Sequence, residues 1–167
     1  GLMLVLTNAS AMFAVSTRAG FTVRNDPAAT ATGVIADETL FRTGVAFDLL
    51  TIAGVIPLLA GLYIVLKPVA PNLALLATLW RVIENAVLAS LAFASLAAVT
   101  LLTGGSFIRS LEPAAAADLA YALLRVHSFG FQAGFLFLGL GQIAFSYLWW
   151  KSRYVPRPLA ALGLVGS

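Results

Sequence analysis

Three neighbouring polar residues, Arg81, Glu84 and Asn85, interrupt the otherwise apolar stretch of residues 72–102. A carboxylate and a guanidinium placed there could bind a polar solute or carry a proton. The stretch holds about 31 residues and, at ~1.5 Å per residue in a helix, is long enough to cross a ~30 Å hydrocarbon layer. Because a charge at that depth is costly, we expect Arg81 and Glu84 to face protein or enclosed water rather than lipid.

The polar residues of this stretch share one helical face. That face repeats at alternating steps of three and four residues, through Thr78, Arg81, Asn85, Leu88, Ala92 and Ser95. Glu84 lies beside it, one turn from Arg81, and is close enough to pair with that guanidinium. Three interpretations stay open: an internal ion pair with an asparagine that ties helices together, a polar site for a solute or proton, and an interface with another subunit.

A second stripe of polar and small residues follows residues 113–150. Its members are Tyr121, Arg125, Ser128, Gln132, Phe135, Gly139, Gln142 and Ser146. Gly130 and Gly134 add the four-residue glycine spacing that lets membrane helices approach closely. We therefore expect this helix to pack against the helix that carries Arg81.

The depth of the polar groups in the membrane follows from counting residues along each helix. The count starts at the helix ends next to Lys67 and residues 151–157, the ends that we expect to face the cytoplasm. Arg81 and Glu84 fall ~14 and ~18 Å deep, and Asp48 and Gln132 both fall ~27 Å deep. A funnel floored by Arg81 and Glu84 and walled by Asp48 and Gln132 is therefore a hypothesis, provided that the helices have the right rotation. The predicted polar cluster comprises Asp48, Arg81, Glu84, Asn85 and Gln132.

Three further residues are expected at the outer rim, namely Arg42, Arg125 and His127. His127, at ~35 Å, is the only histidine, and it is either a hydrogen-bonded structural residue or a pH sensor or ligand. One histidine without any cysteine does not make a metal site, and the sequence implies no cofactor.

Composition places the chain among membrane proteins. Hydrophobic residues make up 60% and charged residues 10% of the sequence, and the mean hydropathy is +0.96. The ten lysines and arginines are scattered, so we expect no nucleic-acid partner. The expected partners are the lipid bilayer and other membrane protein subunits.

The predicted fold is all-α, a polytopic transmembrane bundle with about five visible spanning helices in a single domain over residues 1–167, truncated at both ends. The expected helices are 1–17, 38–66 (capped by Asp37 and kinked at Pro57), 72–103 (capped by Asn72), 113–150, and an incomplete one from Pro158. Residues 18–36 and 106–112 are expected to be loops.

Charge at the connections predicts the orientation. The turns at Lys67 and at residues 151–157 hold four basic and no acidic residues, whereas the opposite loops hold four arginines and five acids. Because the basic turns are short and lie close to the membrane, we place Lys67, Lys151, Arg153 and Arg157 on the cytoplasmic side of a bacterial inner membrane.

Several short motifs, in order, resemble a known family. They are Phe41-Arg42-Thr43-Gly44 with Asp48-Leu49-Leu50, the turn of residues 66–76, Arg81 with Glu84, residues 124–130, and Tyr154-Val155-Pro156-Arg157. Together they resemble the bacterial domain-of-unknown-function family 4386, whose members are multi-span membrane proteins. The resemblance covers nearly the whole chain and implies a helical membrane fold with a final helix missing here. It implies no activity.

We therefore expect a non-catalytic accessory or scaffold component of a membrane complex. The alternative is a small-solute or proton-linked transport or binding protein that uses Asp48, Arg81, Glu84 and Gln132. An enzyme would need Glu84 or Asp48 to act alone as an acid or base. A scaffold should enclose Arg81 and Glu84 completely, whereas a binding protein should have a polar cavity that reaches them.

Overall fold

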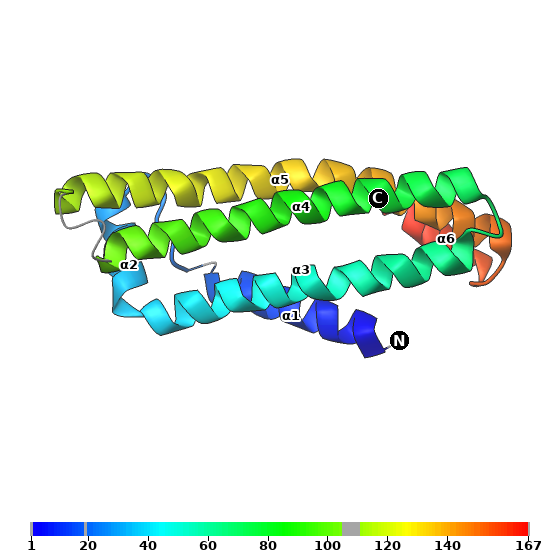
Figure 1. Ribbon diagram of the computed structural model, residues 1–167, viewed down its shortest axis with the longest axis horizontal. Helices are drawn as coiled ribbons and strands as arrows, with labels where there is room; N and C mark the ends of the chain where they lie inside the picture. The colour runs from blue at the N-terminus through cyan, green and yellow to red at the C-terminus, as the bar shows by residue number, and fades with distance from the viewer. Residues whose placement is uncertain (1, 19, 105–110, 167) are drawn as a thin grey trace.

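The computed structural model describes residues 2–18, 20–104 and 111–166, and within them the chain forms helices and no strand (Figure 1). The helices are α1 (Leu2–Arg18), α2 (Pro27–Ala36), α3 (Glu38–Leu66), α4 (Pro71–Thr103), α5 (Pro113–Ser152) and α6 (Arg157–Val165). The predicted all-α class is confirmed. The predicted loop over residues 106–112 lies mostly outside the described residues.

Three of these helices are long and apolar enough to cross a membrane. They are α3, α4 and α5, with 29, 33 and 40 residues. Of the other described helices, α1 has 17 residues, α2 has 10 and α6 has 9. The described residues thus hold three candidate spans where about five were expected, and the predicted class of helical membrane protein holds.

Local signals set the start of α3 and the end of α4. Asp37 caps α3, and its carboxylate accepts a hydrogen bond of 3.1 Å from the backbone N–H of Leu40, as predicted. Gly104 ends α4 in the left-handed conformation at φ 68°, which glycine adopts without strain. The prediction that Asn72 caps α4 is wrong. Pro71 already occupies the first turn, where its missing N–H costs nothing, and Ala70 precedes it as the cap.

The second half of the predicted loop over residues 18–36 is instead a helix, α2. The Asp26 carboxylate accepts a hydrogen bond of 2.8 Å from the N–H of Ala29, and Pro27 stands in the first turn. Alanine then favours continuation of the helix. α2 buries Thr30 and Val34 against α3, α4 and α5 and so caps one end of the bundle (Figure 1).

α4 and α5 pack along each other over most of their length, as the two stripes of polar and small residues predicted (Figure 1). Glycine makes this approach possible. A Cβ added at Gly130 would lie 2.5 Å from Leu91 Cδ2, and one at Gly141 would lie 2.8 Å from Arg81 Cδ. α1 packs on α3, and α6 packs on the end of α5. The α3–α4 and α5–α6 turns lie together at one end (Figure 1).

Candidate functional site

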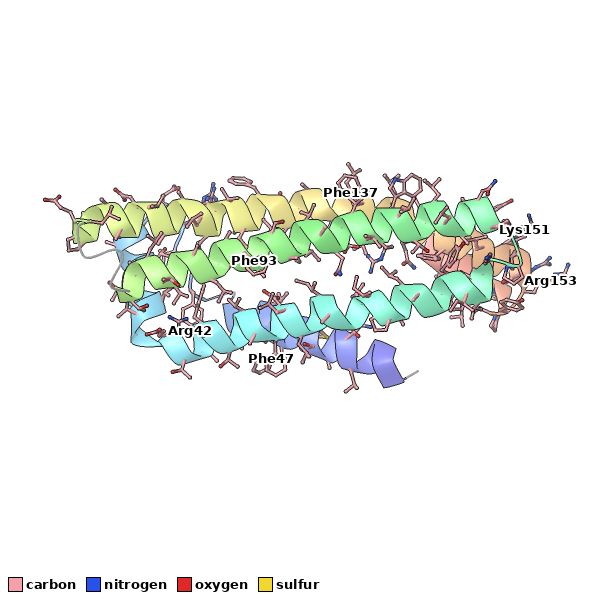
Figure 2. The ribbon with its side chains drawn as sticks, in the orientation of Figure 1. Arg42, Phe47, Phe93, Phe137, Lys151 and Arg153 are labelled. Carbon is pink, nitrogen blue, oxygen red and sulfur yellow. The ribbon has the colours of Figure 1, made fainter. Side chains whose placement is uncertain are left out.

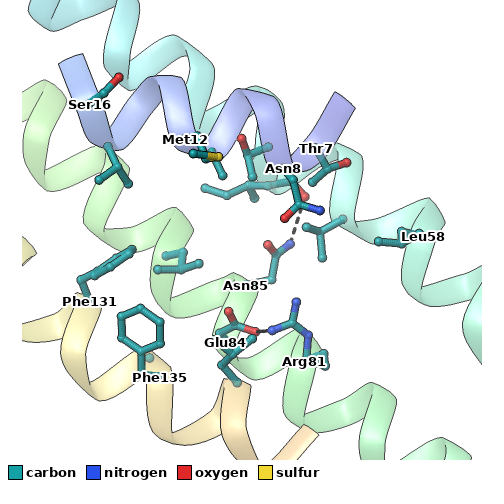
Figure 3. A pocket seen from close by; sticks show the side chains of 18 residues that line it. Thr7, Asn8, Met12, Ser16, Leu58, Arg81, Glu84, Asn85, Phe131 and Phe135 are labelled. Atoms are coloured by element: carbon teal, nitrogen blue, oxygen red, sulfur yellow. Dashed lines mark hydrogen bonds and ion pairs between the residues drawn. The ribbon is translucent and has the colours of Figure 1, made fainter. Parts of the chain in front are cut away.

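Arg81 and Glu84 form an ion pair on α4, in which Nη1 of Arg81 donates to Oε2 of Glu84 (Figure 3). Their side chains are only 18% and 10% exposed. The aliphatic stem of Arg81 lies against Gly141 of α5, where any side chain would meet it. The position of the guanidinium therefore depends on a glycine of the neighbouring helix.

Asn85 is buried next to this pair and links α4 to α3. Its Nδ2 donates a hydrogen bond of 3.1 Å to the backbone carbonyl of Ile52. Figure 3 shows its side chain pointing toward that of Asn8 on α1. Asn85 therefore stands where three helices meet.

A cavity of about 740 Å³ reaches all three of these α4 residues, and side chains of α1, α3, α4 and α5 bound it (Figure 3). Its lining comprises Thr7, Asn8, Ala11, Met12, Val15, Ser16, Thr51, Ile52, Val55, Leu58, Arg81, Glu84, Asn85, Leu88, Phe131, Gly134, Phe135 and Leu138. The volume lies within the range of small-molecule sites, ~300–1,000 Å³, and an apolar wall with few polar groups is typical of them.

α1 supplies polar lining that the sequence interpretation did not include, namely Thr7, Asn8 and Ser16. The sequence does carry a signal for them, because these polar side chains interrupt the apolar run of residues 1–17 just as Arg81 interrupts that of residues 72–102. α1 is held on α3 in part by Ser10, whose hydroxyl donates a hydrogen bond of 2.9 Å to the Phe47 carbonyl.

The structure does not bring the whole predicted polar cluster together. Arg81, Glu84 and Asn85 line the large cavity, and Asp48 and Gln132 do not. Asp48 is half-buried on α3, with its Oδ2 enclosed by protein. Gln132 lines a second, smaller cavity.

That second cavity, of about 270 Å³, lies beside His127. Its lining is Val15, Thr22, Phe41, Ser95, Leu124, His127, Ser128, Phe131 and Gln132. His127 Nδ1 lies 3.0 Å from the Leu91 carbonyl oxygen and 3.1 Å from Ser95 Oγ. Because a carbonyl only accepts, Nδ1 carries a proton in this contact. Val15 and Phe131 line both cavities and so stand between them.

The two rim arginines lie outside both cavities. Arg42 pairs with Glu38 at an Nε–Oε1 distance of 2.5 Å, and the Arg125 guanidinium lies 4.8 Å from the ring centre of Phe129. Within the described parts of the chain, no three histidine, aspartate or glutamate side chains group in a way that could hold a metal ion.

Comparison with known proteins identifies the family. Neither the curated proteins nor the solved structures gave a match. A family model described as a domain of unknown function, DUF4386, matches residues 1–167. This agrees with the resemblance carried by the sequence motifs, and the chain belongs to that family of membrane proteins.

Proposed function

We propose that this protein binds a small molecule inside the membrane, in the cavity that reaches Arg81, Glu84 and Asn85. The observation that carries the proposal is the cavity itself. A pair with only a structural role in helix packing would be enclosed by protein, whereas this pair lines a space of about 740 Å³. The geometry thus favours the binding or transport alternative over the scaffold.

We further propose that the protein does no covalent chemistry on its ligand. The described lining of the cavity holds one carboxylate, Glu84, and no histidine, cysteine, lysine or tyrosine. That carboxylate is already engaged by Arg81. General acid–base catalysis needs a group that is free to exchange its proton with the substrate.

Filling the cavity tests the proposal. Ala11 lines the cavity from α1, whereas Ala9, two residues away, does not line it and is exposed. Native mass spectrometry of protein released from its own membranes should show a retained small molecule. Ala11→Phe should abolish that adduct, and the matched control Ala9→Phe should keep it. An adduct that survives Ala11→Phe, or no adduct in the unchanged protein, contradicts the proposal.

One observation favours the second candidate, an accessory or scaffold subunit of a membrane complex. Polar side chains of α4 bond to neighbouring helices: Asn85 to the Ile52 carbonyl, and Ser95 to His127. Such bonds stabilise helix packing in a bilayer. This candidate predicts a stable partner protein that co-purifies under mild detergent extraction, with no retained small molecule.

For location we propose a bacterial cytoplasmic membrane, with the basic turns facing the cytoplasm and the chain as one domain. Lys151 and Arg153 lie at the end of the bundle away from α2 (Figure 2). Aromatic residues suited to the membrane interface flank them, and the Arg157 guanidinium lies 5.6 Å from the ring centre of Trp150. Basic residues near short turns favour retention on the cytoplasmic side.

A further inference from the structure

We infer that the ligand of the large cavity is an uncharged lipophilic molecule with hydrogen-bond acceptors, and that it reaches the cavity sideways from the bilayer. This inference rests on the proposed binding function and adds the chemical class of the ligand. Four features of the cavity support it: its charge, its wall, its polar donors and its opening.

The charges of the cavity cancel. Arg81 and Glu84 are the only ionisable residues in its described lining, and they pair with each other. An ionic ligand would have to leave water without an unmatched counter-charge to receive it. An uncharged ligand meets no such penalty.

Most of the wall is apolar, and part of it is aromatic. Phe131 and Phe135 meet edge to face with ring centres 5.0 Å apart, and both side chains border the cavity (Figure 3). Leu88 and Met12 extend the apolar surface from α4 and α1. Such a wall suits a hydrocarbon or ring body.

The polar part of the cavity offers hydrogen-bond donors. The ion pair engages Nη1 of Arg81, and a guanidinium carries five N–H groups in all. Donors of the guanidinium therefore remain for a ligand oxygen, whereas the Thr51 hydroxyl on the same lining already donates to the Phe47 carbonyl. A carbonyl group at one end of a lipophile fits this arrangement.

The cavity opens between α1 and α5. Among the described residues α1 packs on α3, and no Cα atom of α1 lies within 8 Å of a Cα atom of α5. At this opening Met12 is 75% and Phe135 is 51% exposed. Phe135 lies near the middle of the spanning helix α5, so the opening faces the hydrocarbon layer rather than water. A lipophile that is already dissolved in the bilayer can enter there.

Photolabelling with a matched probe series tests the ligand class. Benzophenone is an uncharged aromatic ketone that cross-links on illumination, and its para-carboxylate and para-trimethylammonium derivatives add one charge of either sign. The protein in lipid vesicles is labelled with each probe, and labelled peptides are mapped by mass spectrometry. Labelling of the cavity is divided by labelling at Phe93, which is 62% exposed on α4 and reports the lipid-facing surface. Both charged probes should give a ratio roughly tenfold lower than benzophenone, equivalent to ~1.4 kcal/mol of selectivity.

Changing the net charge of the cavity should change this selectivity. Glu84→Gln leaves Arg81 uncompensated and should raise the ratio for the carboxylate probe above that for benzophenone. Arg81→Gln should do the same for the trimethylammonium probe. The double variant restores neutrality and should again prefer benzophenone. Glu38→Gln, in the exposed pair with Arg42, is the matched control and should leave all ratios unchanged.

The outcomes separate the two proposals. If a charged probe labels the cavity of the unchanged protein as strongly as benzophenone, the ligand class is wrong but the binding site stands. If no probe labels the cavity above the Phe93 reference, the binding function itself is contradicted. The comparison of probes on the unchanged protein decides this even if a charge variant fails to fold.

Discussion

Two Arg–Glu pairs of this chain have the same chemistry in different surroundings. The side chains of Arg42 and Glu38 are 44% and 38% exposed, against 18% and 10% for Arg81 and Glu84. An exposed pair contributes ~0–1 kcal/mol to stability, whereas removing one partner of a buried pair costs ~3–5 kcal/mol. The exposed Arg42–Glu38 pair is therefore an internal control for the buried Arg81–Glu84 pair.

Substitution of Glu84 by glutamine should destabilise the fold by about 3 kcal/mol, because the shape is kept and the Arg81 charge is left uncompensated. Glu38→Gln should change stability by less than about 1 kcal/mol. Thermal unfolding of both variants in the same detergent measures the difference. Equal shifts of the unfolding temperature for the two substitutions would show that the Arg81–Glu84 pair is as well solvated as the Arg42–Glu38 pair.

Phe131 stands between the two cavities, stacked on His127 at a ring-centre distance of 6.4 Å and in contact with Phe135. Phe131→Ala should join the cavities and let water reach Leu88 from the His127 side. Since the chain has no cysteine, Leu88→Cys can report this through its rate of reaction with a membrane-impermeant thiol reagent, which needs a hydrated thiolate.

We expect Phe131→Ala to raise that rate several-fold. Phe137, on the same helix, lines neither of these cavities, so Phe137→Ala should leave the rate unchanged. An unchanged rate in both variants would mean that the His127 cavity does not lead to the ion pair.

At the scale of helices, the contact between α4 and α5 positions the ion pair. Gly141→Ala places a Cβ 2.8 Å from Cγ and Cδ of Arg81, so the stem must move. We expect a loss of about 1–3 kcal/mol, typical of overpacking, together with weaker benzophenone labelling of the cavity. Gly61→Ala on α3 meets no atom within 4 Å and should be neutral or stabilise by up to about 1 kcal/mol. Thermal unfolding compares the two, and equal behaviour would contradict a positioning role for Gly141.

Helix boundaries were predictable where a local signal decides them. Asp37 and Gly104 set one end each of α3 and α4 through their own side chain or backbone conformation. α2 was missed because its alanines and threonines resemble a small-residue loop, and only its burial against three other helices shows why it is ordered. Local chemistry predicts helix ends, and tertiary packing determines which weak helices form.

At the scale of the whole molecule, the candidate site was predictable only in part. Arg81, Glu84 and Asn85 lie on one helix, where spacing alone determines their relation. Asp48 and Gln132 lie on other helices at a suitable depth, but counting residues gives depth and not the rotation of each helix. Asn8 interrupts the apolar run of α1, but it reaches the site through the packing of α1 on α3, which depends on tertiary structure.

The proposed orientation predicts which end of the bundle meets the cytoplasm. Tyr154 is exposed at the basic end, and Thr32 is exposed on α2. In the cysteine-free chain, Thr32→Cys should react with an impermeant thiol reagent in whole cells, and Tyr154→Cys only after lysis. The reverse pattern would invert the orientation, and reaction of both in whole cells would contradict the spanning arrangement.

The proposed function requires that a small molecule occupies the cavity at the ion pair. The most direct test is a cryo-EM or crystal map of the protein purified from its native membrane without overexpression. We expect ordered non-protein density bounded by Arg81, Asn85 and Phe135. A closed site, with protein packed against the Arg81–Glu84 pair from every side and a partner subunit on the bundle, would contradict it and leave the scaffold function.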